Sequence, residues 1–482
     1  MIALTAFSSC KKFVEVPSPV TSIDGTAAFQ SDAGAISIMT GVYARAATPN
    51  AGYFTSVSMC AGLSADELIA YGAGPDFIAQ LYSNGLKSGS FSYFWKEFYN
   101  YIYAANEVIE GIAGPNGLTD LTKSRLLGEA KFSRALFNFY LVNLYGHIPL
   151  VTTTDYRVNI SHAQNPADEV YTQIIQDLKD AEGLLGEGYT TADLKTTSTD
   201  RVRPNKWAAT ALLARVYLFT GDYPNAVTES SKVIGQSTLY NLETLDNAFL
   251  KDSKEAIWEL QSVQNNINTY DGNLFILIAA PAYSNPVSLS NYVYNAFEAG
   301  DNRKVKWTGS LTTTGTGAAT YHYSYKYKVR SPGSATIPLT ENTIVMRLAE
   351  QYLIRAEANI RSGNIAQGIA DLNILRNRAR AAVSLAIPDP LPALSSSMTS
   401  TDALKAVEHE RQVEMFTEMG DRWLTLKRMK GFTNPAISRA DEIMPAITAA
   451  KGGTWNTNWQ LYPLPASEII NDVSLVQNPG YN

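Results

Sequence analysis

Apolar side chains recur at helical spacing over long blocks of this chain, and this periodicity restricts its fold more than any other feature. Between residues 91 and 112, Trp95, Phe98 and Ile102 follow one another at intervals of three and four, which places them on one helix face. The block 122–145 carries two apolar sets, so a helix there needs neighbours on two sides. Further helices are expected at 168–185, 206–220, 224–234, 343–361, 365–381 and 401–430, the last broken near Gly420. The pattern predicts a stacked array of helices.

Two of the expected helix pairs resemble each other. Ala214 precedes Gly221 by seven residues, and Ala356 precedes Gly363 by the same interval. Small residues at a helix crossing and glycine at the turn suit close antiparallel packing, as in the tetratricopeptide pattern. Such units cannot bury their own faces, so several must stack. Chance similarity between two amphipathic helix pairs remains the alternative.

Two long segments, residues 46–90 and 246–340, lack the helical period and are rich in Asn, Tyr, Gly, Thr and Ser. Long loops inside a compact helical protein are usually functional or disordered. Their aromatic content argues against disorder. The whole chain holds 27 tyrosines, against 17 phenylalanines and 7 tryptophans, and tyrosine keeps a polar tip for water or ligand. These segments are therefore expected to carry function.

Charge and motifs exclude several classes of function. The 482 residues have a net charge of −6 and no basic run, which argues against a nucleic-acid partner. No apolar stretch reaches the roughly 18 residues of a spanning helix. Two cysteines exclude a disulfide scaffold and a CxxC zinc site. Metalloprotease, nucleophile-elbow and phosphate-loop motifs are missing. We predict no catalytic residue, no metal site and no cofactor.

The N-terminus looks like the end of a bacterial lipoprotein signal. Residues 1–9 are mostly apolar and end in two serines, and Cys10 is followed by two lysines. Signals normally run about 15–30 residues, so this one is short. We expect residues 1–10 to be the signal, with lipidation at Cys10, and residues 11–25 to be a tether. The alternative is a frayed terminus with an ordinary cysteine. Cys60, in an apolar stretch, is expected to be a buried thiol.

Several segments, taken in order, resemble the SusD/RagB family of Bacteroidetes outer-membrane lipoproteins. The first two are the WKEFYNYIYAAN run at 95–106 and the EAKFSRALFNFYLVNLYGHIPL run at 129–150. Towards the C-terminus, ERQVEMFTEMGDRW at 410–423 and LYPLPASEI at 461–469 continue the pattern. Each segment is degenerate alone, whereas the ordered set is specific and extends over essentially the whole chain.

The resemblance implies an all-α fold in which about four tetratricopeptide-like helix pairs form a solenoid scaffold and irregular loops form a ligand face. Residues 26–482 would be a single domain, with helices at about 27–45, 91–236, 343–382 and 401–430. The implied role is capture of a glycan at the cell surface, without catalysis. The implied partner is a SusC-like TonB-dependent transporter, and the location is the outer membrane through a lipid anchor.

The loops contain the residue types that bind sugars. Sugar rings present C–H faces that aromatic rings cover, and rim hydroxyls that Asn, Asp and Arg bind. If residues 321–327 form a strand, its four tyrosines share one face; we expect Tyr325 and Tyr327 to pack inward, while Tyr321 and Tyr323 could equally face a ligand. The candidate ligand-binding residues are Asp66, Tyr71, Tyr82, Tyr283, Asn291, Tyr292, Tyr294, Arg303, Trp307, Tyr321 and Tyr323.

Two other functions stay open at this stage. An all-α glycoside hydrolase would use paired carboxylates, and Glu410, Glu414 and Glu418 stand at four-residue spacing. Because Arg411 and Arg422 flank them, we interpret this cluster as a structural ion-pair network. A tetratricopeptide adaptor that binds a protein segment is the third hypothesis.

Overall fold

The computed structural model describes residues 25–48, 54–72, 76–89, 91–264, 266–331 and 337–481. The expected signal, lipidation at Cys10 and the tether up to residue 24 lie outside these residues and stay predictions, whereas Gly25, the last residue of the expected tether, begins a short helix. Among the described helices, none combines the length and the apolar character needed to cross a bilayer.

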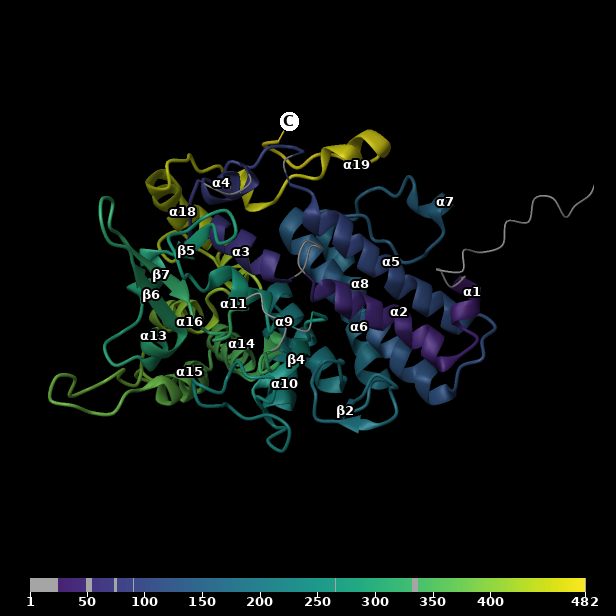
Figure 1. The fold of residues 1–482 in the computed structure, drawn as a ribbon, viewed down its shortest axis with the longest axis horizontal. Coiled ribbons are helices and arrows are strands. Elements are labelled where there is room, and N and C mark those ends of the chain that lie inside the picture. The colour runs from purple at the N-terminus through teal and green to yellow at the C-terminus, as the bar shows by residue number, and fades with distance from the viewer. Residues whose placement is uncertain are drawn as a thin grey trace, which may run out of the picture.

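Long helices form the scaffold, and most of them pack on their neighbours in sequence. α5 packs on α6, α6 on α8, α8 on α9 and α9 on α10, after which α10 packs on α14 and α14 on α15 and α16. Figure 1 shows α2, α5, α6 and α8 at one end of the molecule and α14, α15 and α16 towards the other. The bounds are α2 (Asp32–Ala46), α5 (Tyr93–Ala113), α6 (Asp120–Tyr145), α8 (Ala167–Leu184), α9 (Lys206–Thr220), α10 (Tyr223–Ile234), α14 (Leu348–Arg361), α15 (Ile365–Ala379) and α16 (Ser400–Met415).

Local signals fix the ends of these helices. The side chain of Asn205 accepts a hydrogen bond from the Ala208 amide and caps α9, which ends at Gly221 in the left-handed region. Gly420, with φ of +73°, separates α16 from α17 (Asp421–Arg428), so the predicted break near this glycine is confirmed. The expected helix at 343–361 begins later, because Thr343–Arg347 form a strand.

The all-α expectation is wrong in one respect, because the described chain also contains short strands. β1 (Leu68–Ala70), β5 (Val287–Leu289), β7 (Thr320–Ser324) and β6 (Thr308–Thr312) make an antiparallel sheet in that order. β4 (Ala256–Leu260) pairs with β8 (Thr343–Arg347), and β2 (Tyr189–Thr190) with β3 (Thr197–Ser198). Strands of two to five residues are too short to establish a period of two in the sequence. The tetratricopeptide-like character of the helix pairs stays a prediction.

Shorter helices occur before, between and after the long ones, and those within 46–90 and 246–340 lie in segments that were expected to be irregular. The shorter helices are α1 (Gly25–Ala28), α3 (Phe54–Ser64), α4 (Asp76–Tyr82), α7 (Tyr156–Asn159), α11 (Tyr270–Phe275), α12 (Asn291–Tyr294), α13 (Asn302–Trp307), α18 (Arg439–Ala450), α19 (Ala466–Asn471) and a 3₁₀ turn (Thr457–Gln460). The expectation that 46–90 is a plain loop is corrected by α3, α4 and β1. Residues 57–64 of α3 are all buried, so this part of the helix has no polar face and no amphipathic period in its sequence.

Buried ion pairs join the scaffold helices. Arg134 of α6 binds Asp177 of α8 at 2.7 Å, and Arg215 of α9 binds Glu350 of α14 at 2.6 Å. Asp371 of α15 accepts from Arg355 of α14 and joins these two helices. These pairs fix the register of one helix against the next, since a charge that slips out of its pair stays buried without a partner.

Candidate ligand-binding face

Tyr321 and Tyr323 lie on the same face of β7, and His322 lies on the other, as strand geometry requires. Tyr71 directly follows β1, the strand at one edge of the sheet, and belongs to the same face. Its hydroxyl lies 3.0 Å from the Ser288 hydroxyl on β5. The rings of Tyr71 and Tyr321 meet edge to face, with centroids 5.5 Å apart. The sheet therefore joins two segments that are 250 positions apart in the chain.

Tyr323 and Tyr325 continue this row of rings, with centroids 6.0 Å apart. Gly309 on β6 makes room for Tyr323, because a side-chain carbon there would lie 2.3 Å from the tyrosine ring. Tyr71, Tyr321, Tyr323 and Tyr325, which we call the aromatic strip, are all partly exposed. Rings that are held by their neighbours and still reach solvent suit the C–H face of a sugar.

A second aromatic group lies on the opposite face of the sheet. The rings of Tyr294 and His322 stack in parallel with centroids 3.4 Å apart, and the Lys304 ammonium lies 4.4 Å from the Tyr294 ring centre. The Ser310 hydroxyl and Nδ1 of His322 share a hydrogen bond of 2.8 Å. Burial lowers the pKa of His322, and the charge of Lys304 lowers it further. His322 and Lys304 were not among the predicted ligand-binding residues, although the alternation along 321–327 places His322 opposite the tyrosines.

Other predicted residues lie around the sheet. Tyr283, Asn291 and Tyr292 are exposed, with Tyr283 at 72%. Tyr82 packs beside the Lys451 ammonium, 4.9 Å from its ring centre. Burial raises the pKa of Tyr82, and the nearby phenols of Tyr71 and Tyr292 raise it further. Tyr82 and Tyr292 therefore lie near one end of the aromatic strip.

The prediction of ligand contact is wrong for three residues, because the structure places their side chains in the interior. Asp66 is 2% exposed and binds Arg422 through both carboxylate oxygens, at 2.7 and 2.6 Å. Trp307 has no exposed surface and donates to the Leu245 carbonyl at 2.8 Å. Arg303 has none either. Sequence composition alone could not separate these interior residues from loop residues.

Arg303 belongs to a buried ion-pair network that is centred on three acids, Glu410, Glu414 and Glu418. Arg303 binds Glu410 at 2.5 Å and Glu414 at 2.8 Å, and Arg347 binds Glu414 at 2.6 Å and Glu418 at 2.7 Å. The cluster is an ion-pair network, as interpreted, but its partners differ from those expected: the flanking Arg411 and Arg422 pair with Asp421 and Asp66 instead. Because arginines occupy the carboxylates and little solvent reaches them, this cluster is unsuited to the paired acid and base of a glycosidase.

The same network continues to the sheet formed by β1, β5, β7 and β6. Lys326, two residues beyond β7, donates to the backbone carbonyls of Glu414 and Phe416 and to the Glu418 carboxylate. Ser324 of β7 shares a hydrogen bond of 2.8 Å with Thr417. The inner side of β7 is thus fixed to the segment between α16 and α17, which keeps its outer tyrosines in place.

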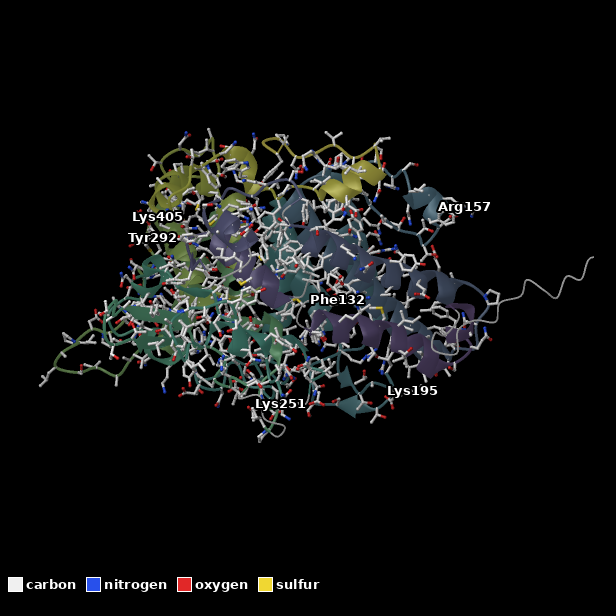
Figure 2. All side chains as sticks on the ribbon, turned by 45° about the horizontal axis from the view of Figure 1, so that its top comes forward. Phe132, Arg157, Lys195, Lys251, Tyr292 and Lys405 are labelled. Carbon is white, nitrogen blue, oxygen red and sulfur yellow. The ribbon has the colours of Figure 1, made fainter. Side chains whose placement is uncertain are left out.

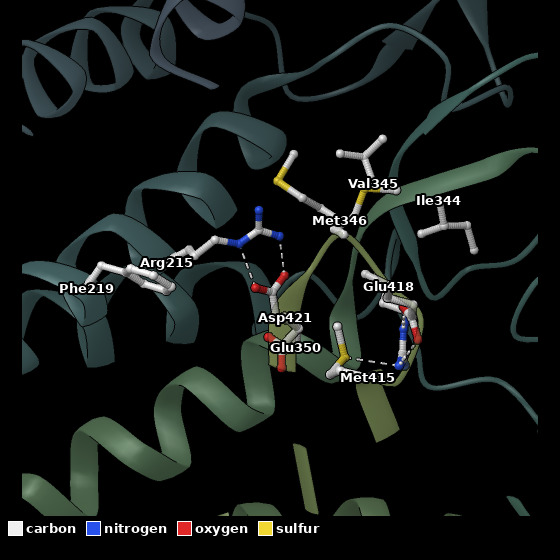
Figure 3. Close-up of a pocket in the computed structure, with 11 residues that line it drawn as sticks. Arg215, Phe219, Ile344, Val345, Met346, Glu350, Met415, Glu418 and Asp421 are labelled. Atoms are coloured by element: carbon white, nitrogen blue, oxygen red, sulfur yellow. Dashed lines mark hydrogen bonds and ion pairs between the residues drawn. The ribbon is translucent and has the colours of Figure 1, made fainter. Parts of the chain in front are cut away.

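A cavity of about 20 Å³ beside this network is lined by Arg215, Glu350, Arg347 and Met415 among others (Figure 3). Its polar groups already bind one another: Figure 3 shows the Arg215–Glu350 pair and the contacts of Glu418 and Met415. Such a volume holds about one water molecule and is far too small for a sugar. In the described part of the chain, no three His, Cys, Asp or Glu side chains gather in a way that would hold a metal ion.

The remaining interior predictions agree with the structure. Trp95 is 3% exposed and Cys60 is buried with a free thiol. Tyr327 is buried, and its hydroxyl accepts a hydrogen bond from the Ile344 amide. Tyr325 departs from the expectation of inward packing, since it stays partly exposed beside Tyr323. β7 ends at Ser324, so the alternation along the four tyrosines does not continue as a strand.

Comparison with known proteins supports the resemblance found in the sequence. Residues 72–218 match a family model described as starch-binding, associating with the outer membrane, and residues 288–481 match that of the SusD family. SusD-like protein P2 of Formosa agariphila is 26% identical over 440 residues, which are 83% of this chain and 82% of that one. The starch-binding protein SusD of Bacteroides thetaiotaomicron is 24% identical, over 76% of this chain and 74% of its own.

The fold also matches solved structures. A laminarin-binding SusD-like protein superposes with a TM-score of 0.73 at 23% identity, over 93% of this chain and 99% of its own. The two family models, the relatives and the shared fold all lead to the same conclusion. This chain belongs to the SusD/RagB family.

Proposed function

We propose that this protein captures a glycan on its aromatic strip and delivers it to a SusC-like TonB-dependent transporter in the outer membrane. The observation that carries the first part is the row of partly exposed rings of Tyr71, Tyr321, Tyr323 and Tyr325. Tyr292 and Asn291 beside it supply groups for sugar hydroxyls. The relatives named for starch and laminarin support glycan as the class of ligand.

The site is open and one-sided, which suits capture followed by release. Its rings can cover one face of a sugar, and all four stay partly exposed. We therefore propose a modest affinity. We also propose that the protein is a binding protein and not a hydrolase, since its central carboxylates are engaged by arginines.

Affinity electrophoresis and calorimetry against starch, laminarin and a panel of other polysaccharides test this proposal. The double variant Tyr71→Ala, Tyr321→Ala is expected to lose at least about tenfold in affinity, because central aromatic anchors carry most of the binding energy. Tyr103→Ala is the matched control, since Tyr103 is exposed on the scaffold helix α5. Full retention by the double variant, or release of reducing sugar by the pure protein, would contradict the proposal.

Anchoring and delivery need separate experiments. Cys10→Ala in the full-length precursor is expected to abolish labelling by radioactive palmitate and to release the protein from outer-membrane fractions. Delivery predicts that the native protein copurifies with a TonB-dependent barrel, and that cells without that barrel retain glycan at the surface but do not import it. Import without the barrel would overturn the transporter assignment.

A further inference from the structure

A second surface lies far from the aromatic strip, between α7 and α19. Figure 1 places these two short helices above α5, at the end of the molecule opposite β6 and β7. Arg157 of α7 and Tyr292 of α12 lie at opposite ends in Figure 2 as well. The surface combines a cavity with a rim of exposed apolar side chains.

The cavity has an aromatic floor. It measures about 280 Å³ and lies over Trp95 and Tyr99 of α5, with the remaining lining from Pro149, Val151, Asn159, Ile160, His162, Glu468, Asn471, Asp472 and Leu475. The rings of Trp95 and Tyr99 are 5.0 Å apart, and Tyr99 donates to the Pro149 carbonyl at 2.8 Å. These contacts hold the floor rigid.

Among the described residues, the carboxylates around this floor lack cation partners, although Asp472 accepts hydrogen bonds from the amide and the hydroxyl of Ser474. Neither Glu468 nor Asp472 has a lysine, arginine or histidine within ion-pair distance in the described part of the chain. The Oδ1 atom of Asn159 is buried and has no hydrogen-bond partner there, while its Nδ2 donates to the Thr153 carbonyl. Burial raises the pKa of Tyr99, and the charge of Glu468 raises it further, which places that carboxylate close to the floor.

Carboxylates and an unpaired carbonyl above two aromatic rings are complementary to a cation with several N–H donors. A guanidinium offers five donors in a plane and stacks on aromatic faces. Ammonium and guanidinium groups over Trp or Tyr also gain cation–π attraction. The charge of the cavity therefore selects a positive group, which a neutral hexose does not have.

The rim indicates the source of that group. Ile160, Ile470 and Val473 are 63%, 78% and 95% exposed, and Tyr156, Val158 and Val476 are exposed on the same two segments. Apolar clusters of this kind mark protein interaction surfaces. Branched aliphatic side chains fit those of a polypeptide, whereas sugar rings are usually bound by aromatic side chains.

We propose that the surface between α7 and α19 docks a segment of a partner protein that inserts an arginine or lysine into the cavity between apolar neighbours. This assignment does not depend on glycan binding at the aromatic strip.

The test uses the full chain and three probes. They are acetyl-Val-Arg-Val-amide, the same peptide with citrulline in place of arginine, and glucosamine. Citrulline has the same shape but no charge, so it isolates the electrostatic contribution. Binding is followed by calorimetry and by the indole N–H signal of Trp95, which is assigned by its loss in Trp95→Phe.

The arginine peptide is expected to shift the Trp95 signal and to bind at least about fivefold more tightly than the citrulline peptide. The variant Glu468→Gln, Asp472→Asn is expected to abolish that difference and still bind glycan. Asn at 472 keeps the oxygen that accepts from Ser474, so the local turn is preserved. Ile470→Ser with Val473→Ser is expected to weaken both peptides equally.

Two outcomes would overturn the assignment. Equal affinity for the two peptides would mean that the carboxylates do not select a cation. A shift of Trp95 by glucosamine at lower concentration than by the arginine peptide would make the cavity an amino-sugar site. Loss of glycan binding at the aromatic strip would leave these results unaffected, so the two proposals can fail separately.

Discussion

The ring of Tyr71 packs edge to face against the ring of Tyr321, with centroids 5.5 Å apart, across the sheet that joins β1 to β7. β5 lies between the two strands, and Ser288 on β5 binds the Tyr71 hydroxyl. The aromatic strip thus exists only when three distant segments pair. Its integrity therefore depends on the whole four-stranded sheet and on the segments that support it.

The first prediction concerns the space beneath Tyr323. In Gly309→Ala the new carbon would meet the tyrosine ring at 2.3 Å, so the ring must move out of the strip. We expect glycan affinity to fall by about fivefold, or roughly 1 kcal/mol, while thermal stability changes little. Gly41→Ala is the control, because that glycine has open space in α2. Unchanged affinity in Gly309→Ala would show that Tyr323 does not contact the glycan.

The second prediction concerns the buried arginine of the ion-pair network. Arg303→Met leaves Asp301, Glu410 and Glu414 buried with one partner fewer, and we expect a loss of about 3–5 kcal/mol in the free energy of unfolding. Chemical denaturation measures it. Lys306→Ala is the matched control on the same helix: its pair with Asp246 is exposed, so less than about 1 kcal/mol is expected. Similar losses in both variants would refute the assignment of a buried network.

The third prediction concerns pH. Burial raises the pKa of Glu67 to about 8, the nearby Asp66 charge adds to this, and Oε1 of Glu67 has no hydrogen-bond partner among the described residues. The folded state therefore keeps a proton that the unfolded state loses above its ordinary pKa. The stability contributed by this group is complete below about pH 4.5 and declines as pH rises to about 8.

Glu67→Gln removes this titration. We expect the free energy of unfolding of the variant to exceed that of the parent by up to about 3 kcal/mol at pH 7, and to equal it near pH 4. Denaturation series from pH 4 to 8 measure the difference. The exposed Glu187→Gln should leave the profile as it is in the parent. A parallel profile for Glu67→Gln and the parent would contradict the assignment of a neutral buried carboxyl.

The fourth prediction concerns the break between α16 and α17. Gly420 has a φ of +73°, and a side-chain carbon there would lie 2.9 Å from that of Ala61. Gly420→Ala combines backbone strain with overpacking, so we expect a loss of about 2–4 kcal/mol. Gly363→Ala has the same kind of φ with open space around it, and about 1 kcal/mol is expected. Thermal unfolding measures the two losses. Equal decreases in Tm for the two variants would exclude the close approach of α3 to this glycine.

Some of the architecture could be predicted from local signals. α9 coincides with the expected helix at 206–220, because Asn205 caps its start and Gly221 ends it. The break at Gly420 also followed from a single residue type. The strands β1, β5, β6 and β7 could not be predicted, since each is short and is stabilised by partners far away in the chain.

The candidate site was predicted in part for the same reason. Tyrosines in polar loops were identified, and Tyr71, Tyr321 and Tyr323 do share a surface. Asp66, Arg303 and Trp307 have the same loop composition, and yet they lie inside the protein, because their partners Arg422, Glu410 and Leu245 come from other segments.

The sequence by itself determined the helical scaffold, the family and the tyrosine-rich character of the two long loop segments, because periodicity, caps and composition are local properties. The tertiary structure alone decided which of those residues reach solvent together. Burial and ion pairing depend on contacts between segments that are hundreds of positions apart, and no local pattern records them.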